Sequence, residues 1–131
     1  MFNSFDIDGV IYMGDGKYGV KPHYDDIIIT GRSHEESVET KLMLRDVGIH
    51  NKVFYNPVNF DAKTRFTSGI HKASILNKFK GDINIHFEDD PIQIKVIKDK
   101  CPWLNVVWLD HDLTQKENIR HVFEISKPEK A

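Results

Sequence analysis

Two aspartates stand one residue apart near the start of the chain, and their spacing raises the question of a cation site. The stretch S-F-D-I-D-G-V-I-Y covers residues 4–12 and contains Asp6, Asp8 and Gly9 after a short strand-like segment. Two neighbouring carboxylates repel each other unless a cation lies close to both. The same letters also suit a solvated turn, because Asp-Gly is a common turn pair. The rest of the sequence has to decide between the two.

Five short segments that are rich in apolar residues predict the β-strands that would position such a site. The run from Ile27 to Ile29 is apolar at every position, as in a central strand that is covered on both faces. The expected strands are residues 2–6, 26–30, 52–55, 83–88 and 105–109.

Amphipathic segments between these strands predict helices. Ser33 and Glu36 form an S-x-x-E capping box, which indicates a helix that begins there and continues to Gly48. Further helices are expected over residues 67–79, from Pro91 through Ile97, and from Thr114, where Glu117 completes a second capping box.

One segment interrupts this alternation. Residues 10–24 hold Gly14, Asp15 and Gly16 between β-forming residues, a pattern typical of a hairpin with a tight turn. Strands that otherwise alternate with helices predict an α/β fold with a largely parallel sheet. We expect one domain over residues 1–126 and a disordered tail over residues 127–131.

Composition bounds the class of protein. The chain has 131 residues, 40% of them hydrophobic and 29% charged, as in a globular domain with a real core. A net charge of −2 gives no overall attraction to nucleic acids or anionic membranes, although a local basic patch is compatible with it. Cys101 is the only cysteine, which excludes a disulfide framework and a thiolate metal cluster. We expect a cytoplasmic protein with no membrane span.

Polar groups follow the predicted strands where an open parallel sheet binds its ligands. Such sheets bind ligands beyond the carboxyl ends of the strands, at the point where the strand order reverses. The polar groups are Asp6 to Gly9 after the first strand, Thr30 to Ser33 after the second, Glu88 to Asp90 after the fourth, and Lys72 on the helix before the fourth. This grouping favours a site over a turn.

In this order the four segments resemble the motifs of the haloacid dehalogenase-like (HAD) phosphohydrolases. D-I-D-G-V-I matches the first motif, and I-I-I-T-G-R is similar to the second. Lys72 stands where the third-motif lysine belongs, and H-F-E-D-D-P resembles the acidic fourth motif. The resemblance runs from Phe2 to about Leu109. It implies a three-layer α/β/α sandwich with a mostly parallel, five-stranded, Rossmann-like sheet and a β-hairpin flap.

The resemblance also implies roles in catalysis. Asp6 would attack phosphorus and form an aspartyl-phosphate, and Asp8 would protonate the leaving oxygen and then activate water. Thr30 would donate a hydrogen bond to the phosphoryl oxygens, and Lys72 would neutralise the charge of nucleophile and phosphate. Gly9, Gly31 and Arg32 would contribute to substrate binding.

The implied cofactor is Mg²⁺, which prefers hard oxygen ligands. The expected ligands are Asp6, Asp8 through its backbone carbonyl, and Asp89, with Asp90 as a neighbouring candidate. Because Glu88 lengthens the acidic run, the main ligand from the fourth motif stays open among Glu88, Asp89 and Asp90.

The spacing of the motifs bears on the substrate. Neither residues 9–29 nor residues 56–71 can hold a cap domain, so we expect a capless site that is open to solvent. An open site and the T-G-R segment, which is similar to the phosphatase domain of polynucleotide kinase-phosphatases, favour a nucleotide or a nucleic-acid 3′-phosphate. Five basic residues near the expected mouth could follow a phosphodiester backbone: Lys17, Lys21, Arg32, Lys63 and Arg65.

Two alternatives stay open. One is a phosphatase for a small metabolite such as a sugar phosphate, with the site completed by a second subunit of an oligomer. The other is a binding module that has the HAD fold and no catalytic activity.

Overall fold

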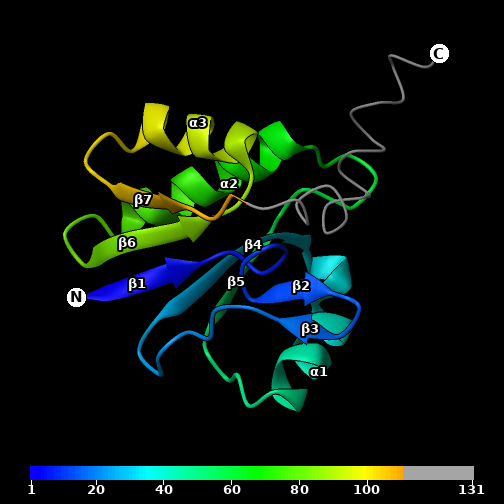
Figure 1. Ribbon diagram of the computed structural model, residues 1–131. Coiled ribbons are helices and arrows are strands. Elements are labelled where there is room, and N and C mark those ends of the chain that lie inside the picture. The colour runs from blue at the N-terminus through cyan, green and yellow to red at the C-terminus, as the bar shows by residue number, and fades with distance from the viewer. Residues whose placement is uncertain (111–131) are drawn as a thin grey trace.

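A parallel sheet forms the centre of the protein. The computed structural model describes residues 1–110, and its five-stranded sheet has the order β5-β4-β1-β6-β7 (Figure 1). All neighbouring strands in it are parallel. The strands are β1 (Phe2–Phe5), β4 (Ile27–Ser33), β5 (Val53–Asn56), β6 (Ile83–Glu88) and β7 (Asn105–Trp108). The strand order reverses between β1 and β6, where an open α/β sheet binds its ligands.

Helices flank the sheet on both faces. Helices α2 (Arg65–Lys78) and α3 (Pro91–Lys100) pack against each other on one face, and α1 (Ser37–Asp46) lies on the other (Figure 1). A 3₁₀ turn, η1 (His34–Glu36), leads from β4 into α1. The expected α/β class with a parallel sheet is therefore confirmed for residues 1–110.

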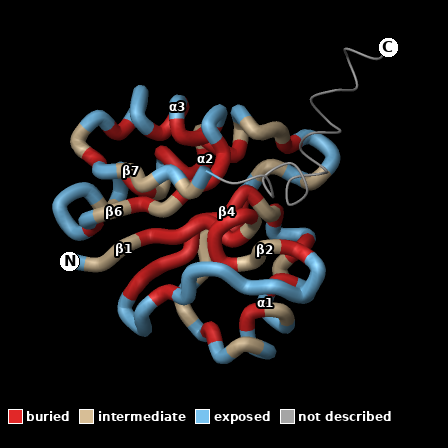
Figure 2. The backbone as a smooth tube through the Cα atoms, viewed as in Figure 1, coloured by how far each residue is buried: buried red, intermediate tan, exposed pale blue. Residues whose placement is uncertain are grey.

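The side chains of β4 alternate between two apolar clusters. Ile27 and Ile29 pack with α2 and α3, whereas Ile28 packs with Leu44 of α1 and with Phe5 of β1. Strand residues point to opposite faces in turn, so an unbroken apolar run requires cover on both sides. Figure 2 shows this strand buried along almost its whole length.

A hairpin takes the place of a first crossover helix, as the glycines indicate. Strands β2 (Tyr12–Gly14) and β3 (Lys17–Tyr18) pair in antiparallel orientation. The turn residues Asp15 and Gly16 have φ angles of 52° and 73°, which suit a tight hairpin turn. The Tyr18 hydroxyl donates to the Met43 carbonyl at 3.4 Å, which brings the hairpin against α1.

Most predicted strands agree with the structure to within one residue at each end, and the exception is instructive. Strand β4 continues to Ser33 instead of ending at Thr30, because β5 pairs with it as far as Ser33 and Asn56. The predicted helix from Thr114 and the predicted tail over residues 127–131 lie outside the described residues.

None of the helices among residues 1–110 combines the length and the apolar character that crossing a bilayer requires.

Candidate functional site

A buried lysine lies at the carboxyl end of the sheet, between two acidic side chains. Lys72 extends from α2 and places Nζ 2.9 Å from Asp6 Oδ1 and 2.8 Å from Glu88 Oε1. Its side chain is only 1% exposed. Burial lowers the pKa of Lys72, but Asp6 and Glu88 raise it by more, so the pKa lies above its ordinary value. The lysine is therefore a fixed positive charge inside the site.

Three carboxylates gather around this point. Asp6, Glu88 and Asp89 are all buried, and each places one oxygen within 4.8 Å of the others. Burial raises the pKa of Asp6 well above its ordinary value, and the charge of Glu88 raises it further against the opposing effect of Lys72. The cluster could hold a metal ion, because carboxylate oxygens are the ligands that hard divalent cations take.

The two remaining aspartates of the predicted motifs each pair with an arginine. Asp8 accepts from Arg32 Nε at 2.9 Å and from Arg32 Nη2 at 2.7 Å. Asp90 accepts from Arg65 Nε at 2.7 Å and from Arg65 Nη2 at 2.6 Å. Asp90 also caps α3, because its Oδ1 accepts from the Ile92 backbone N–H at 2.9 Å. The side chains of Asp8 and Asp90 therefore serve ion pairs and lie outside the three-carboxylate group.

The local charge balance fits a divalent cation. Arg32 and Arg65 neutralise the two outer aspartates, and Lys72 pairs with Asp6 and Glu88 of the three-carboxylate group. When fully ionised, the group and its lysine carry two excess negative charges. Buried like charges are costly unless a cation compensates them, so the residues present fit a bound divalent ion.

A neutral histidine holds the Glu88 carboxylate in place through a hydrogen bond. His86 Nε2 lies 3.1 Å from Glu88 Oε1, and His86 Nδ1 lies 2.7 Å from Ser4 Oγ. Burial, followed by the nearby charge of Lys72, lowers the pKa of His86 well below its ordinary value. The neutral ring therefore donates a hydrogen bond through Nε2–H to Glu88 and accepts one from the Ser4 hydroxyl at Nδ1.

The sequence prediction missed this chain of contacts, although a signal for it was present. Ser4 and Asp6 are two residues apart, as are His86 and Glu88, and in extended chain this spacing directs both side chains of a pair to one face of the sheet. Ser4 and His86 are then neighbours in the β1–β6 register.

Gly9 is required by lack of space. Its φ of +86° lies in the left-handed region, as expected for the bend after Asp8. A Cβ at this position would lie 1.9 Å from Asp89 Oδ2, far closer than non-bonded atoms approach. Only glycine lets the chain after β1 come this close to the carboxylate that follows β6.

The T-G-R segment lies on β4, which pairs with β1, the strand that ends just before Asp6. Thr30 is fully buried, and its Oγ1 accepts from the Arg32 backbone N–H at 3.0 Å. The Gly31 carbonyl accepts from Lys63 Nζ at 3.2 Å. Lys63 also lies 2.6 Å from Glu36 Oε2.

These contacts change the basic surface expected at the mouth of the site. Arg32, Lys63 and Arg65 are each paired with a carboxylate, and Lys17 and Lys21 are exposed. The five cations therefore do not form one free basic surface at this end of the sheet.

His71, next to Lys72, predicts a pH dependence of stability. Its Nε2 lies 3.3 Å from the Phe54 carbonyl, and burial lowers its pKa from 6.5 to about 4. The unfolded chain thus binds a proton more readily than the folded one below pH 6.5, so stability falls as pH falls. The full effect is about 3 kcal/mol, of which roughly 2 kcal/mol is lost between pH 7.5 and pH 5.

Urea unfolding of His71→Gln at these two pH values measures the effect. Glutamine keeps a donor for the Phe54 carbonyl and cannot titrate, so the pH dependence should shrink by that amount. The variant His50→Gln, at an exposed histidine, serves as the control and should keep the full dependence. Equal pH dependence in wild type and His71→Gln would contradict the prediction.

Comparison of the chain with protein-family models, with curated proteins and with solved structures found no match.

Proposed function

We propose that this protein is a Mg²⁺-dependent phosphatase that hydrolyses a phosphomonoester through an aspartyl-phosphate on Asp6. The observation that supports it most directly is Lys72, fully buried and held between Asp6 and Glu88 beside Asp89. A fixed ammonium beside an acidic cluster is the arrangement that would bring an anionic phosphate next to an anionic nucleophile.

The proposed reaction has two steps. In the first, an Asp6 carboxylate oxygen attacks phosphorus, the bond from phosphorus to the leaving oxygen breaks, and Asp8 gives that oxygen its proton. In the second, Asp8 takes a proton from water, the water oxygen attacks phosphorus, and Asp6 leaves as a carboxylate. Inorganic phosphate and an alcohol are the products, and both aspartates return to their starting states.

Asp8 must part from Arg32 before it can act. Both of its oxygens accept from the Arg32 guanidinium, so neither is directed to a leaving group while the pair is closed. An incoming phosphate offers the same guanidinium two oxygens in a similar geometry. We infer that Arg32 exchanges Asp8 for the phosphate when substrate binds. The freed Asp8 carboxylate then takes up one proton from solvent, and this is the proton that it gives to the leaving oxygen.

The metal would be held by Asp6 and Asp89. Glu88 would instead pair with Lys72 and accept a hydrogen bond from His86. A bound Mg²⁺ would offset the negative charge of nucleophile and phosphate. Thr30 and the backbone of Gly31, on the neighbouring strand β4, would line the phosphate position.

A phosphate-release assay tests the proposal. The panel contains p-nitrophenyl phosphate, nucleoside monophosphates, sugar phosphates and a 3′-phosphorylated oligonucleotide, each with Mg²⁺ and with EDTA. We expect release from at least one class with Mg²⁺ and its loss in EDTA. Release from none of them, or equal release in EDTA, would contradict the proposal. Preference for sugar phosphates would instead select the small-metabolite alternative.

A further inference from the structure

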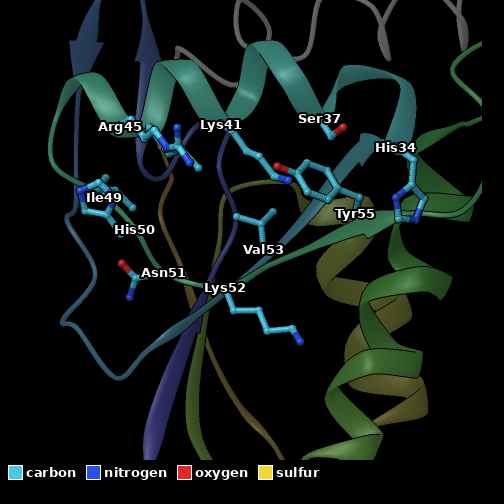
Figure 3. A pocket seen from close by; sticks show the side chains of 11 residues that line it. His34, Ser37, Lys41, Arg45, Ile49, His50, Asn51, Lys52, Val53 and Tyr55 are labelled. Carbon is cyan, nitrogen blue, oxygen red and sulfur yellow. The ribbon is translucent and has the colours of Figure 1, made fainter.

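A groove separate from the acidic cluster runs between α1 and the edge strand β5. Its volume is about 630 Å³, and Figure 3 shows side chains from both elements around it. The lining side chains used below are His34, Lys41 and Arg45 from η1 and α1, His50 from the loop that follows α1, and Tyr55 from β5. Among the described residues that line the groove, none is acidic.

Three cations line the groove, Lys41 and Arg45 on α1 and Lys52 just before β5, and the two on α1 are available to a ligand. Lys41 and Arg45 are exposed, and neither forms an ion pair with a carboxylate within residues 1–110. They stand four residues apart on α1, so they share one face of the helix at successive turns. Two cations so placed can each contact a different phosphate of one extended ligand.

Tyr55 adds an independent sign of a ligand. The residue is 9% exposed, and its enclosed hydroxyl has no hydrogen-bond partner among the described residues. Buried polar atoms without partners are uncommon in folded proteins. Burial raises the pKa of Tyr55, so the phenol keeps its proton and remains a donor at neutral pH. Figure 3 shows the hydroxyl on the side of the groove where Lys41 extends.

One end of the groove is lined by residues that lie close in sequence to the T-G-R segment. His34 directly follows Ser33, the last residue of β4, and Tyr55 lies near the carboxyl end of β5. Arg32 is close enough to Tyr55 for its charge to oppose the rise in the hydroxyl's pKa. His50, at the other end of the groove, precedes β5. An anion that reaches from Arg32 along this edge of the sheet must therefore be longer than one phosphate group.

We propose that the α1–β5 groove binds the sugar–phosphate backbone of a single-stranded nucleic acid whose 3′-phosphate enters the site at Asp6. Lys41 and Arg45 contact phosphates, and the Tyr55 hydroxyl donates to a phosphate oxygen once the Lys41 side chain moves aside. This assignment of the substrate rests on the proposed phosphatase function. The binding test below is independent of turnover.

The test measures binding of a fluorescein-labelled, 3′-phosphorylated single strand by anisotropy, in EDTA. Lys41→Ala/Arg45→Ala should weaken binding roughly tenfold or more at low salt and reduce the slope of log K against log salt by about 1.4, since each lost contact contributes about 0.7. Lys78→Ala/Lys80→Ala removes the same charge from the exposed end of α2 and the turn that follows it, and should change neither. Equal effects of the two double variants would overturn the proposal.

Two further measurements sharpen the result. Tyr55→Phe should bind severalfold more weakly without a lower free energy of unfolding, and unchanged affinity would overturn the role of the hydroxyl. Polyglutamate of equal charge should bind more weakly than the oligonucleotide, and equal binding would overturn the nucleic-acid assignment.

The outcomes for the groove and for the phosphatase can be told apart. If the oligonucleotide binds as expected but no phosphate is released from any substrate, the phosphatase proposal fails and the groove is supported. If release occurs and Lys41→Ala/Arg45→Ala raises the KM for the oligonucleotide no more than that for p-nitrophenyl phosphate, the groove proposal fails alone.

Discussion

Asp6→Asn is expected to lower kcat for phosphate release by at least about a thousandfold, because an amide cannot form the aspartyl-phosphate. The same change should leave the free energy of unfolding equal to that of wild type or raise it. Burial and Glu88 already hold the pKa of Asp6 well above its ordinary value, so the ionised group is costly in the folded state. Lys72 keeps Glu88 as its partner in the variant.

Phosphate release and urea unfolding, both measured at pH 7.5, check the two halves of this prediction. Loss of activity in Asp6→Asn without loss of stability would show that Asp6 acts in the reaction, and that the variant is not inactive because it is unfolded. Asp61→Asn, at an exposed aspartate, is the control and should match wild type in both measurements. Asp6→Asn with wild-type kcat would exclude Asp6 as the nucleophile.

The second large effect is expected at Lys72. Lys72→Met should reduce the free energy of unfolding by about 3–5 kcal/mol, because it leaves Asp6 and Glu88 buried without their cation. Methionine has a similar length and no charge, so the loss reports the missing ammonium more than missing volume. Urea unfolding in metal-free buffer measures the change.

A double variant makes this test specific. Lys72→Met/Glu88→Gln removes one of the two stranded carboxylates and should recover part of the lost stability. Lys78→Met, on the exposed end of the same helix, should change stability by less than about 0.5 kcal/mol. A loss at Lys72→Met no larger than at Lys78→Met would show that the buried pair is not a major electrostatic contact.

The strands could be predicted from the sequence because apolar runs are local signals. Strand β6 was predicted with its observed bounds, residues 83–88, and the hairpin followed from Gly14, Asp15 and Gly16. The extra length of β4 was not predictable, since it depends on how far β5 pairs with it. Strand register depends on two segments that are distant in the sequence, so it cannot be predicted from either segment alone.

The same limit applies to the candidate site. The residue types at the strand ends indicated where Asp6, Lys72 and Asp89 would meet, and the structure brings them together. The partners of the flanking charges were not predictable, because Asp8 and Arg32 are 24 positions apart. Which carboxylate remains for a metal and which is used by an arginine is decided only when the strands are in place.

The contact between Gly9 and Asp89 has a consequence for how substitution data on this protein should be interpreted. In a scan of every position, Gly9 would be as intolerant of substitution as a reacting group, although it has no side chain. Its intolerance would come from occupied space, since the carboxylate of Asp89 fills the place where any larger residue would put its first carbon. Sensitivity to replacement would therefore mark two kinds of position here: those whose side chains take part in the reaction, and those where neighbouring atoms leave no room for a side chain.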